Sequence, residues 1–232
     1  MPIEVEENPD AVADAAARRV AEAAALAIAA RGRFSIALSG GRTPRGLYQR
    51  LAAGVTPPID WSRMRIYFAD ERAVPPDDPE SNFRLARETL IDPAGIPPKN
   101  VHRMKGEYPD LAAAVEEYEA HLGEPLDLVV LGLGEDGHIA SLFPGRGAVL
   151  ETVPRVAAVL DAPKPPPRRL TLTPRALAEA REVLVLVTGS EKAAAAARAL
   201  ETSGPASELP ARLVRDRVWL LDRAAAAGLS PR

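Results

Sequence analysis

Short apolar runs alternate with helix-forming segments along the whole sequence, and this alternation constrains the fold more than any other feature. The run 126–131 is apolar at nearly every position, as expected for a strand that is covered on both faces. Further strands are predicted at 34–38, 64–69, 101–104, 155–160, 182–187 and 217–221. Helices are predicted at 11–30, 43–53, 81–90, 110–122, 191–200 and 223–228, with a polar loop at 70–79. The alternation predicts a Rossmann-like α/β fold: a doubly wound, mostly parallel central sheet with helices on both faces.

The composition excludes several classes of protein. The 232 residues include no cysteine, which rules out a disulfide scaffold, thiol catalysis and cysteine-ligated metal centres. A formal net charge of −3 and only 4% aromatic residues argue against a nucleic-acid partner. No segment has the roughly 18 uninterrupted apolar residues of a membrane span, and the acidic start of the chain does not resemble a signal peptide. We therefore expect a single cytoplasmic domain over residues 1–232, a monomer or small homo-oligomer without a membrane partner.

The junctions after the strands are the candidate site residues, because ligands of such sheets bind where loops leave the carboxyl ends of strands. The strand 34–38 is followed by Ser39-Gly40-Gly41-Arg42-Thr43-Pro44. Two glycines let backbone N–H groups approach a ligand, and the helix start marked by Thr43 and Pro44 favours a phosphate. The segment is not a Walker A loop, because no Lys-Ser or Lys-Thr pair follows the second glycine. A tight turn that binds nothing is the alternative.

Asp70, Glu71 and Arg72 stand together directly after the predicted strand 64–69. Carboxylates at this edge of the sheet can orient sugar hydroxyls, and the guanidinium can neutralise an anion. A solvated loop start is the alternative interpretation.

Two later junctions also carry cations. Arg168 and Arg169 follow the segment 163–167, which is predicted to be a stiff extended loop and ends in three prolines. Lys192 lies in the first turn of the helix that follows Gly189, where a cation opposes the helix dipole and favours an anionic neighbour. These cations are predicted to contact a phosphate; for the two arginines, solvated charge on an edge strand is the alternative.

The segment 132–144 contains a G-x-G-x-x-G match at Gly132, Gly134 and Gly137. A dinucleotide fingerprint needs a helix that opens at once and an early position in the domain, whereas Pro144 stops any helix here within a turn or two. The match therefore does not indicate a dinucleotide site.

Asp136 and His138 in the same segment are the candidate catalytic pair. Their i, i+2 spacing points both side chains the same way in extended backbone. The carboxylate can then fix the imidazole tautomer while the other ring nitrogen acts as a base. The other two histidines, His102 and His121, are interpreted as structural, because neither lies in a glycine loop after a strand.

Other chemistries find little support in the sequence. Ser39 lacks the first glycine of a G-x-S-x-G nucleophile motif, and three scattered histidines give no metal-ligand spacing. We expect neither a metal nor a cofactor. An anion-binding pocket with one well-placed histidine remains, which suits general-base attack of water on an already activated electrophile.

Taken together, these junctions resemble the 6-phosphogluconolactonase family. The resemblance spans nearly the whole chain and rests, in order, on segments 39–44, 70–75, 81–82, 132–144, 169–173, 189–192 and 209–211. The related glucosamine-6-phosphate deaminase family shares the fold, a Gly-Gly loop and an Asp-Gly-His segment. It usually continues differently after Asp-Glu and after the histidine than this chain does in 72–75 and 140–144. Arg42 departs from the lactonase pattern, which often has a small polar residue there.

The resemblance implies hydrolysis of 6-phospho-D-glucono-1,5-lactone to 6-phosphogluconate, a step of the pentose phosphate pathway, without metal or organic cofactor. It implies that His138 is the general base and that Asp136 orients it or contacts the substrate. The substrate or phosphate contacts would come from Ser39, Gly40, Gly41, Thr43, Asp70, Arg72, Arg168, Arg169 and Lys192.

Two other functions stay open. A deaminase or isomerase acting on glucosamine 6-phosphate would release ammonia, which distinguishes it from a lactonase. A non-enzymatic sugar-phosphate sensor would normally carry a DNA-binding segment, and the sequence contains no basic helix-turn-helix.

Overall fold

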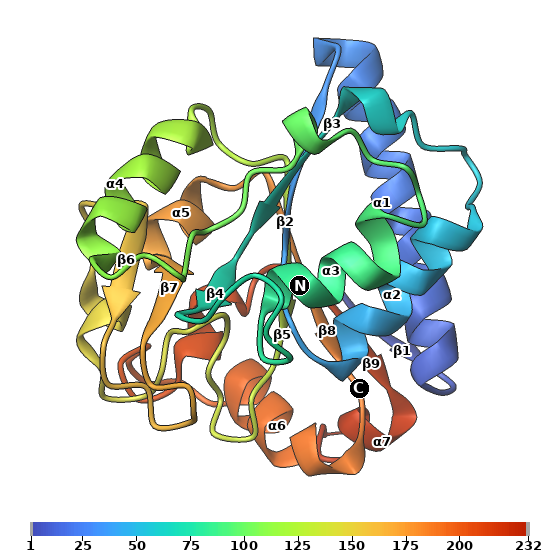
Figure 1. Ribbon diagram of the computed structural model, residues 1–232. Helices are drawn as coiled ribbons and strands as arrows, with labels where there is room; N and C mark the ends of the chain where they lie inside the picture. Colours follow the sequence, from blue (N-terminus) through green and yellow to red (C-terminus); the bar gives the residue numbers. More distant parts are fainter. Residues whose placement is uncertain (1, 231–232) are drawn as a thin grey trace.

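The computed structural model describes residues 2–230, and its centre is a six-stranded sheet (Figure 1). Every pairing in this sheet is parallel, and the strand order is β1-β9-β8-β5-β2-β3. The strands are β1 (Ile3–Glu6), β2 (Phe34–Leu38), β3 (Met64–Phe68), β5 (Leu128–Gly132), β8 (Glu182–Val187) and β9 (Val218–Asp222). The predicted doubly wound parallel sheet is confirmed.

Helices cover both faces of the sheet. They are α1 (Pro9–Arg31), α2 (Arg42–Ala53), α3 (Asn82–Ala86), α4 (Leu111–Leu122), α5 (Pro174–Glu179), α6 (Ala193–Glu201) and α7 (Arg223–Ala226). Figure 1 shows α1, α2 and α3 on one side of the sheet and α4 and α5 on the other. The longest, α1, begins at Asn8, whose side chain accepts a hydrogen bond from the Ala11 N–H, and ends at Gly32 with a φ of 77°.

A second, three-stranded sheet lies beside the first, on the left in Figure 1. It consists of β4 (Asp70–Arg72), β7 (Arg169–Leu172) and β6 (Val156–Val159) in the order β4-β7-β6, and both pairings are antiparallel. The prediction of a loop at 70–79 is therefore wrong for its first three residues. Three consecutive charged residues show no apolar periodicity, and only their pairing with a distant strand makes them a strand.

Four other expectations need correction. The segment Ile3–Glu6 was not expected to form a strand, but it pairs along β9 at the edge of the large sheet. The predicted strand 101–104 is reduced to a single bridge between Val101 and Ile66. The predicted helix 81–90 is divided into α3 and a π-helical turn over Arg87–Ile91, and α5 was not predicted.

One hydrophobic core joins the two sheets. Leu170 and Leu172 of β7 belong to the same buried cluster as Val129 and Val130 of β5. We therefore propose that both sheets form one domain, although Met1, Pro231 and Arg232 of the predicted range lie outside the described residues. No helix within residues 2–230 is long and apolar enough to cross a membrane.

The strand order decides where a site can form. From β2 the chain continues to β3 on one side, whereas β5 lies on the other side of β2. Such a change of direction opens a crevice at the carboxyl ends of the adjacent strands. The loops after β2 and β5, which begin at Ser39 and Leu133, flank this crevice.

Candidate active site

A cavity of about 560 Å³ opens at this crevice, between the loops that follow β2, β5 and β8. Residues of the second sheet complete its wall, so the cavity depends on both sheets. The predicted site residues that line it are Ser39, Gly40, Gly41, Thr43, Asp70, Arg72, His138, Arg169 and Lys192.

The imidazole of His138 is held from two sides. Its Nδ1 lies 2.5 Å from Oδ1 of Asp136, and its ring centroid lies 4.6 Å from that of Phe143. A Cβ at position 134 would collide with the imidazole, so only glycine fits there. Because a carboxylate only accepts hydrogen bonds, Nδ1 carries the proton and Nε2 is the basic nitrogen.

The backbone around His138 is fixed by short-range hydrogen bonds. The Gly134 N–H donates to the His138 carbonyl at 2.9 Å, and the Gly137 N–H donates to the Gly134 carbonyl at 2.9 Å. Gly137 has a φ of 85°, and Ala140, which lines the cavity, has a φ of 47°. A non-glycine residue in this region is strained, and such strain clusters at functional sites.

The Asp136 carboxyl stays ionised. Burial raises its pKa, but the hydrogen bond and charge of His138, together with the Lys164 ammonium, outweigh burial and hold the pKa well below its usual range. Lys164 lies with its Nζ 3.7 Å from Oδ1 of Asp136. The carboxylate can therefore hold the imidazole in a fixed orientation.

The glycine turn after β2 is shaped by its neighbours. The Ser39 hydroxyl donates to the Val130 carbonyl at 2.8 Å, and the buried Tyr48 hydroxyl donates to the Ser39 carbonyl at 2.6 Å. A Cβ at position 40 would collide with the Asn82 side chain. Gly41 is the N-cap of α2, has a φ of 108° and offers no side-chain cap. The first-turn N–H groups of α2 are thus arranged for an anion rather than for a capping side chain.

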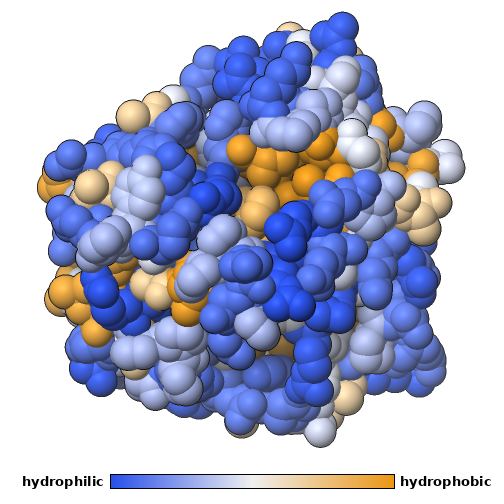
Figure 2. Space-filling view, in the orientation of Figure 1, coloured by the Kyte–Doolittle hydropathy of each residue, from blue (hydrophilic) through white to orange (hydrophobic). Residues whose placement is uncertain are grey.

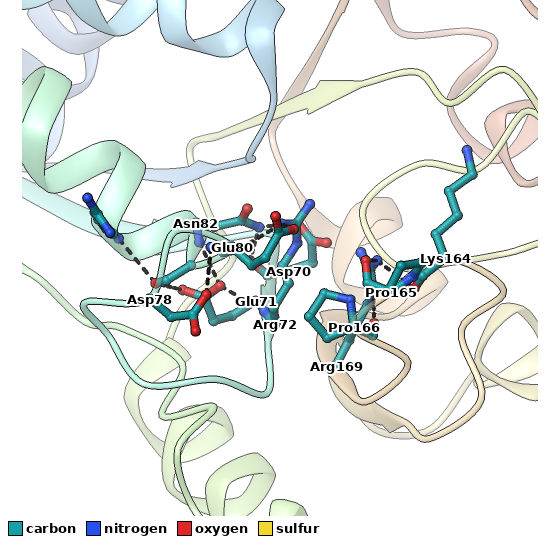
Figure 3. Close-up of polar contacts among 12 residues, drawn as sticks. Asp70, Glu71, Arg72, Asp78, Glu80, Asn82, Lys164, Pro165, Pro166 and Arg169 are labelled. Carbon is teal, nitrogen blue, oxygen red and sulfur yellow. Dashed lines mark hydrogen bonds and ion pairs between the residues drawn. The ribbon is translucent and has the colours of Figure 1, made fainter.

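Asp70 is a buried residue in the wall of the cavity. It accepts hydrogen bonds from the Ser141 hydroxyl at 2.7 Å and from Nδ2 of Asn82 at 3.0 Å. The Asn82 side chain thus packs against Gly40 and also donates a hydrogen bond to Asp70. Figure 3 shows Asn82 beside Asp70.

Glu71 is buried beside Asp70 and accepts four hydrogen bonds. The donors are the N–H groups of Arg72 (2.7 Å), Asn82 (2.7 Å) and Phe83 (2.8 Å) and the Ser81 hydroxyl (3.1 Å). Burial raises the pKa of Glu71 to about 7, although the three backbone donors lower it in part. This carboxyl fixes the turn from β4 to α3 and does not line the cavity.

The Arg72 guanidinium lines the cavity beside this turn. Its Nη1 donates to the Glu80 carbonyl at 2.7 Å, whereas its Nε is buried without a hydrogen-bond partner among the described residues. Within residues 2–230 the one carboxylate that forms an ion pair with Arg72 is Glu80, at 3.5 Å.

The junction after β8 brings a second cation to the glycine turn. The Thr43 and Thr188 hydroxyls lie 2.6 Å apart, which joins the starts of α2 and of the segment 189–192. The Lys192 ammonium lies 3.4 Å from Oε1 of Glu135, the residue before Asp136. Lys192 therefore connects the glycine turn to the histidine loop.

The two predicted arginines, Arg168 just before β7 and Arg169 at its start, lie in different environments. Arg169 is buried, and its Nε and Nη2 donate to the carbonyls of Pro166 (2.9 Å), Lys164 (3.0 Å) and Pro165 (3.2 Å) (Figure 3). Arg168 is exposed, donates to the Pro109 carbonyl and does not line the cavity. Its assignment to the site needs correction, because consecutive residues of an extended chain point to opposite faces.

Sequence reasoning did not assign Lys164 or Thr188 to the site, although both line the cavity. Lys164 is one of four lysines and lies within the segment 163–167, which is predicted to be a stiff extended loop, so a signal was present. Thr188 directly follows the strand 182–187 and opens the junction 188–192, where ligand contacts are expected.

His102 and His121 lie elsewhere. They line a separate cavity of about 500 Å³ between α3 and α4, and His102 stacks on Tyr67 with a centroid distance of 4.7 Å. Figure 2 shows a mainly hydrophilic face with apolar surface gathered in its upper middle. Residues 2–230 contain no group of three or more histidine and acidic side chains placed to hold a metal ion.

Comparison with known proteins places this geometry in a family. The family model described as "Glucosamine-6-phosphate isomerases/6-phosphogluconolactonase" matches residues 7–221. A 6-phosphogluconolactonase of Mycobacterium tuberculosis is 43% identical over 98% of both chains. The structure of 6-phosphogluconolactonase from Trypanosoma brucei superposes with a TM-score of 0.87 at 30% identity and covers 99% of this chain and 98% of its own. A monomeric glucosamine-6-phosphate deaminase shares the fold, with a TM-score of 0.84 at 23% identity over 98% of this chain and 100% of its own. The chain therefore belongs to the glucosamine-6-phosphate isomerase/6-phosphogluconolactonase family.

Proposed function

We propose that this chain hydrolyses 6-phospho-D-glucono-1,5-lactone to 6-phospho-D-gluconate, as a cytoplasmic step of the pentose phosphate pathway. The observation that carries the proposal is His138, which lines a cavity that also presents cations and a helix start and whose Nδ1 lies 2.5 Å from the Asp136 carboxylate behind it. Relatives named 6-phosphogluconolactonase, matched over nearly the whole chain, support the substrate.

The pair provides the base for the reaction. Nε2 of His138 removes a proton from water while the water oxygen attacks C1 of the lactone. The ionised Asp136 keeps the proton on Nδ1 and stabilises the imidazolium that forms. When the tetrahedral intermediate collapses, the bond from C1 to the ring oxygen breaks and the imidazolium returns the proton to that oxygen. The products are a carboxylic acid, which ionises, and the 5-hydroxyl.

The other end of the cavity suits the phosphate. The N–H groups at Gly40, Gly41 and Thr43 and the Lys192 ammonium offer donors and positive charge for a dianion. Arg72 faces the same cavity, and Asp70 can orient a sugar hydroxyl. A phosphate held here fixes the lactone carbon against the water on His138 without itself reacting.

The test is a stopped assay with freshly generated 6-phosphogluconolactone, corrected for spontaneous hydrolysis. We expect turnover well above the uncatalysed rate and much weaker turnover of glucono-1,5-lactone, which lacks the phosphate. Release of ammonia from glucosamine 6-phosphate without lactone hydrolysis would instead identify a deaminase. Binding of sugar phosphates without turnover of either substrate would identify a sensor. The monomeric or small homo-oligomeric state expected from the sequence stays a prediction.

A further inference from the structure

The turn before β7 places a lysine at the catalytic pair. Lys164 lines the cavity, and its Nζ lies 3.7 Å from the same Asp136 oxygen that accepts from His138. This distance is too long for a hydrogen bond, so the ammonium is near the pair without being bonded to it. Its side chain is 46% exposed, which leaves it free to move within the cavity mouth.

The backbone of Lys164, in contrast, is held tightly. The buried guanidinium of Arg169 donates to the three carbonyls of 164–166, and its Cζ lies 5.4 Å from the centroid of the Phe143 ring. Phe143 is also the ring that packs against His138. The lysine backbone and the imidazole are therefore positioned by the same aromatic side chain. Figure 3 shows the Lys164 side chain extending away from the guanidinium.

The histidine loop has several of its N–H groups already engaged. Those of Gly134 and Leu142 donate to carbonyls inside the loop, and that of Ser141 donates to the Thr171 hydroxyl. Attack of water on a carbonyl creates an oxyanion, which needs a donor or a positive charge within reach. Among the described residues, Lys164 is the lysine or arginine whose charged group lies within 4 Å of the Asp136 carboxylate, at 3.7 Å.

We propose that Lys164 is a further catalytic residue, whose ammonium pairs with the oxyanion formed at C1 of the lactone, and that Arg169 is a positioning residue acting through it. This inference rests on the proposed hydrolysis. As the water oxygen bonds to C1, the C=O electron pair moves to the carbonyl oxygen, and the ammonium neutralises that charge without losing its proton. Collapse restores the C=O bond and ends the contact.

The decisive variant is Lys164→Met, which keeps the length of the side chain and removes the charge. We expect kcat to fall about 10–100-fold, less than for a buried oxyanion donor because Lys164 is half-exposed. KM should stay within about twofold, because the contact forms only in the transition state. The affinity for inorganic phosphate, measured by the rise in melting temperature, should also be unchanged.

Two further variants make the test specific. Lys164→Arg keeps a cation and should recover at least about half of the lost activity on a logarithmic scale. Lys99→Met, at an exposed lysine outside the cavity, should match the wild type. A Lys164→Met enzyme with wild-type kcat, or one whose loss lies in KM and phosphate affinity, would overturn the proposal while leaving the lactonase function intact. Absence of wild-type turnover would overturn both.

Arg169→Lys tests the positioning role. It retains one charge but cannot reach three carbonyls in a fork, so kcat should fall as in Lys164→Met. The double variant should then be no slower than Lys164→Met alone, because both changes act through one ammonium. Losses that multiply would show that Arg169 acts independently of Lys164. Circular dichroism and thermal unfolding verify that each variant is folded; if Arg169→Lys is not, the Lys164 series decides the proposal by itself.

Discussion

The two ends of the cavity are built in different ways. At the histidine end, backbone hydrogen bonds close the loop, Gly134 leaves no space for a side chain, and the imidazole packs between a carboxylate and Phe143. At the glycine end, the cation Lys192 is held by a single surface carboxylate, and the side chain of Arg42 is 92% exposed.

The difference follows from what each end has to do. A general base works only when its nitrogen, the water and the carbonyl are aligned, so small displacements are costly. A phosphate dianion is attracted through charge, which falls off slowly with distance and tolerates several arrangements of donors. We infer that packing fixes the geometry of the histidine end, whereas charge provides the binding at the glycine end. Four substitutions test this contrast.

The largest effect is expected for His138→Ala. Loss of the base should lower kcat by about 10²–10⁴-fold, with KM and phosphate affinity little changed. His121→Ala is the matched control, because this histidine lies in the other cavity and should leave turnover intact. A folded His138→Ala enzyme with near-normal turnover would refute the assignment of the base.

The stability of the protein should depend on pH through Glu71, which is buried beside Asp70. Its pKa in the folded protein is raised from 4.5 to about 7, so folding takes up a proton between these pH values. The stability from this group is fully present below about pH 4.5 and is lost as pH rises to 7, by about 3 kcal/mol in total. Glu71→Gln cannot titrate, so its free energy of unfolding should depend less on pH in this window. The free energy of unfolding is measured by urea denaturation at several pH values between about 4.5 and 7.5. An equal change with pH in Glu71→Gln and in the wild type would contradict this prediction.

Lys192→Ala should act on binding rather than on turnover. We expect KM to rise about tenfold with kcat within about threefold, because the phosphate is held similarly in ground and transition states. Inorganic phosphate should also protect this variant less against thermal unfolding than it protects the wild type. A fall in kcat at constant KM would show that Lys192 affects the chemical step, so that binding at the glycine end and catalysis at the histidine end are coupled.

The smallest effect is expected for Arg42→Ala. The Arg42 guanidinium lies 3.2 Å from Glu191, but exposed ion pairs contribute little to stability or geometry. KM and the melting temperature should therefore stay close to those of the wild type, within about twofold for KM. A tenfold rise in KM would place Arg42 among the phosphate contacts, where the lactonase pattern often has a small polar residue.

The sequence predicts the large sheet well because its strands are buried on both faces. Runs such as 126–131 and 182–187 are apolar enough to be recognised alone. The strand β4 escapes recognition because its three charged residues carry no apolar periodicity. The strand β1 does alternate apolar and charged residues, but four residues are too few for a clear signal. The partners of both strands lie far along the chain. Long-range pairing, rather than local preference, makes these segments strands.

The site is predictable to the extent that it follows the large sheet. Ser39, Asp136 and His138 come from loops after its strands, where ligands are expected. Two further positions depend instead on β7, whose antiparallel pairing fixes which residue faces inward. This pairing decides that Arg169 rather than Arg168 faces the cavity, and it places Lys164 at the cavity. Nothing local in the sequence indicates that pairing, so the sequence alone does not assign Lys164 a role.

The pairing of Ile3 with Trp219 has a consequence for how the protein is made. The first strand emerges from the ribosome long before β9, which is its sole partner in the sheet, and α1 also packs against β9. The growing chain can therefore assemble its middle strands early, but β1 stays unpaired until β9 has been made. A chain that stops before β9 leaves β1 without a partner and turns β8, an interior strand, into an exposed edge, which is a template for aggregation.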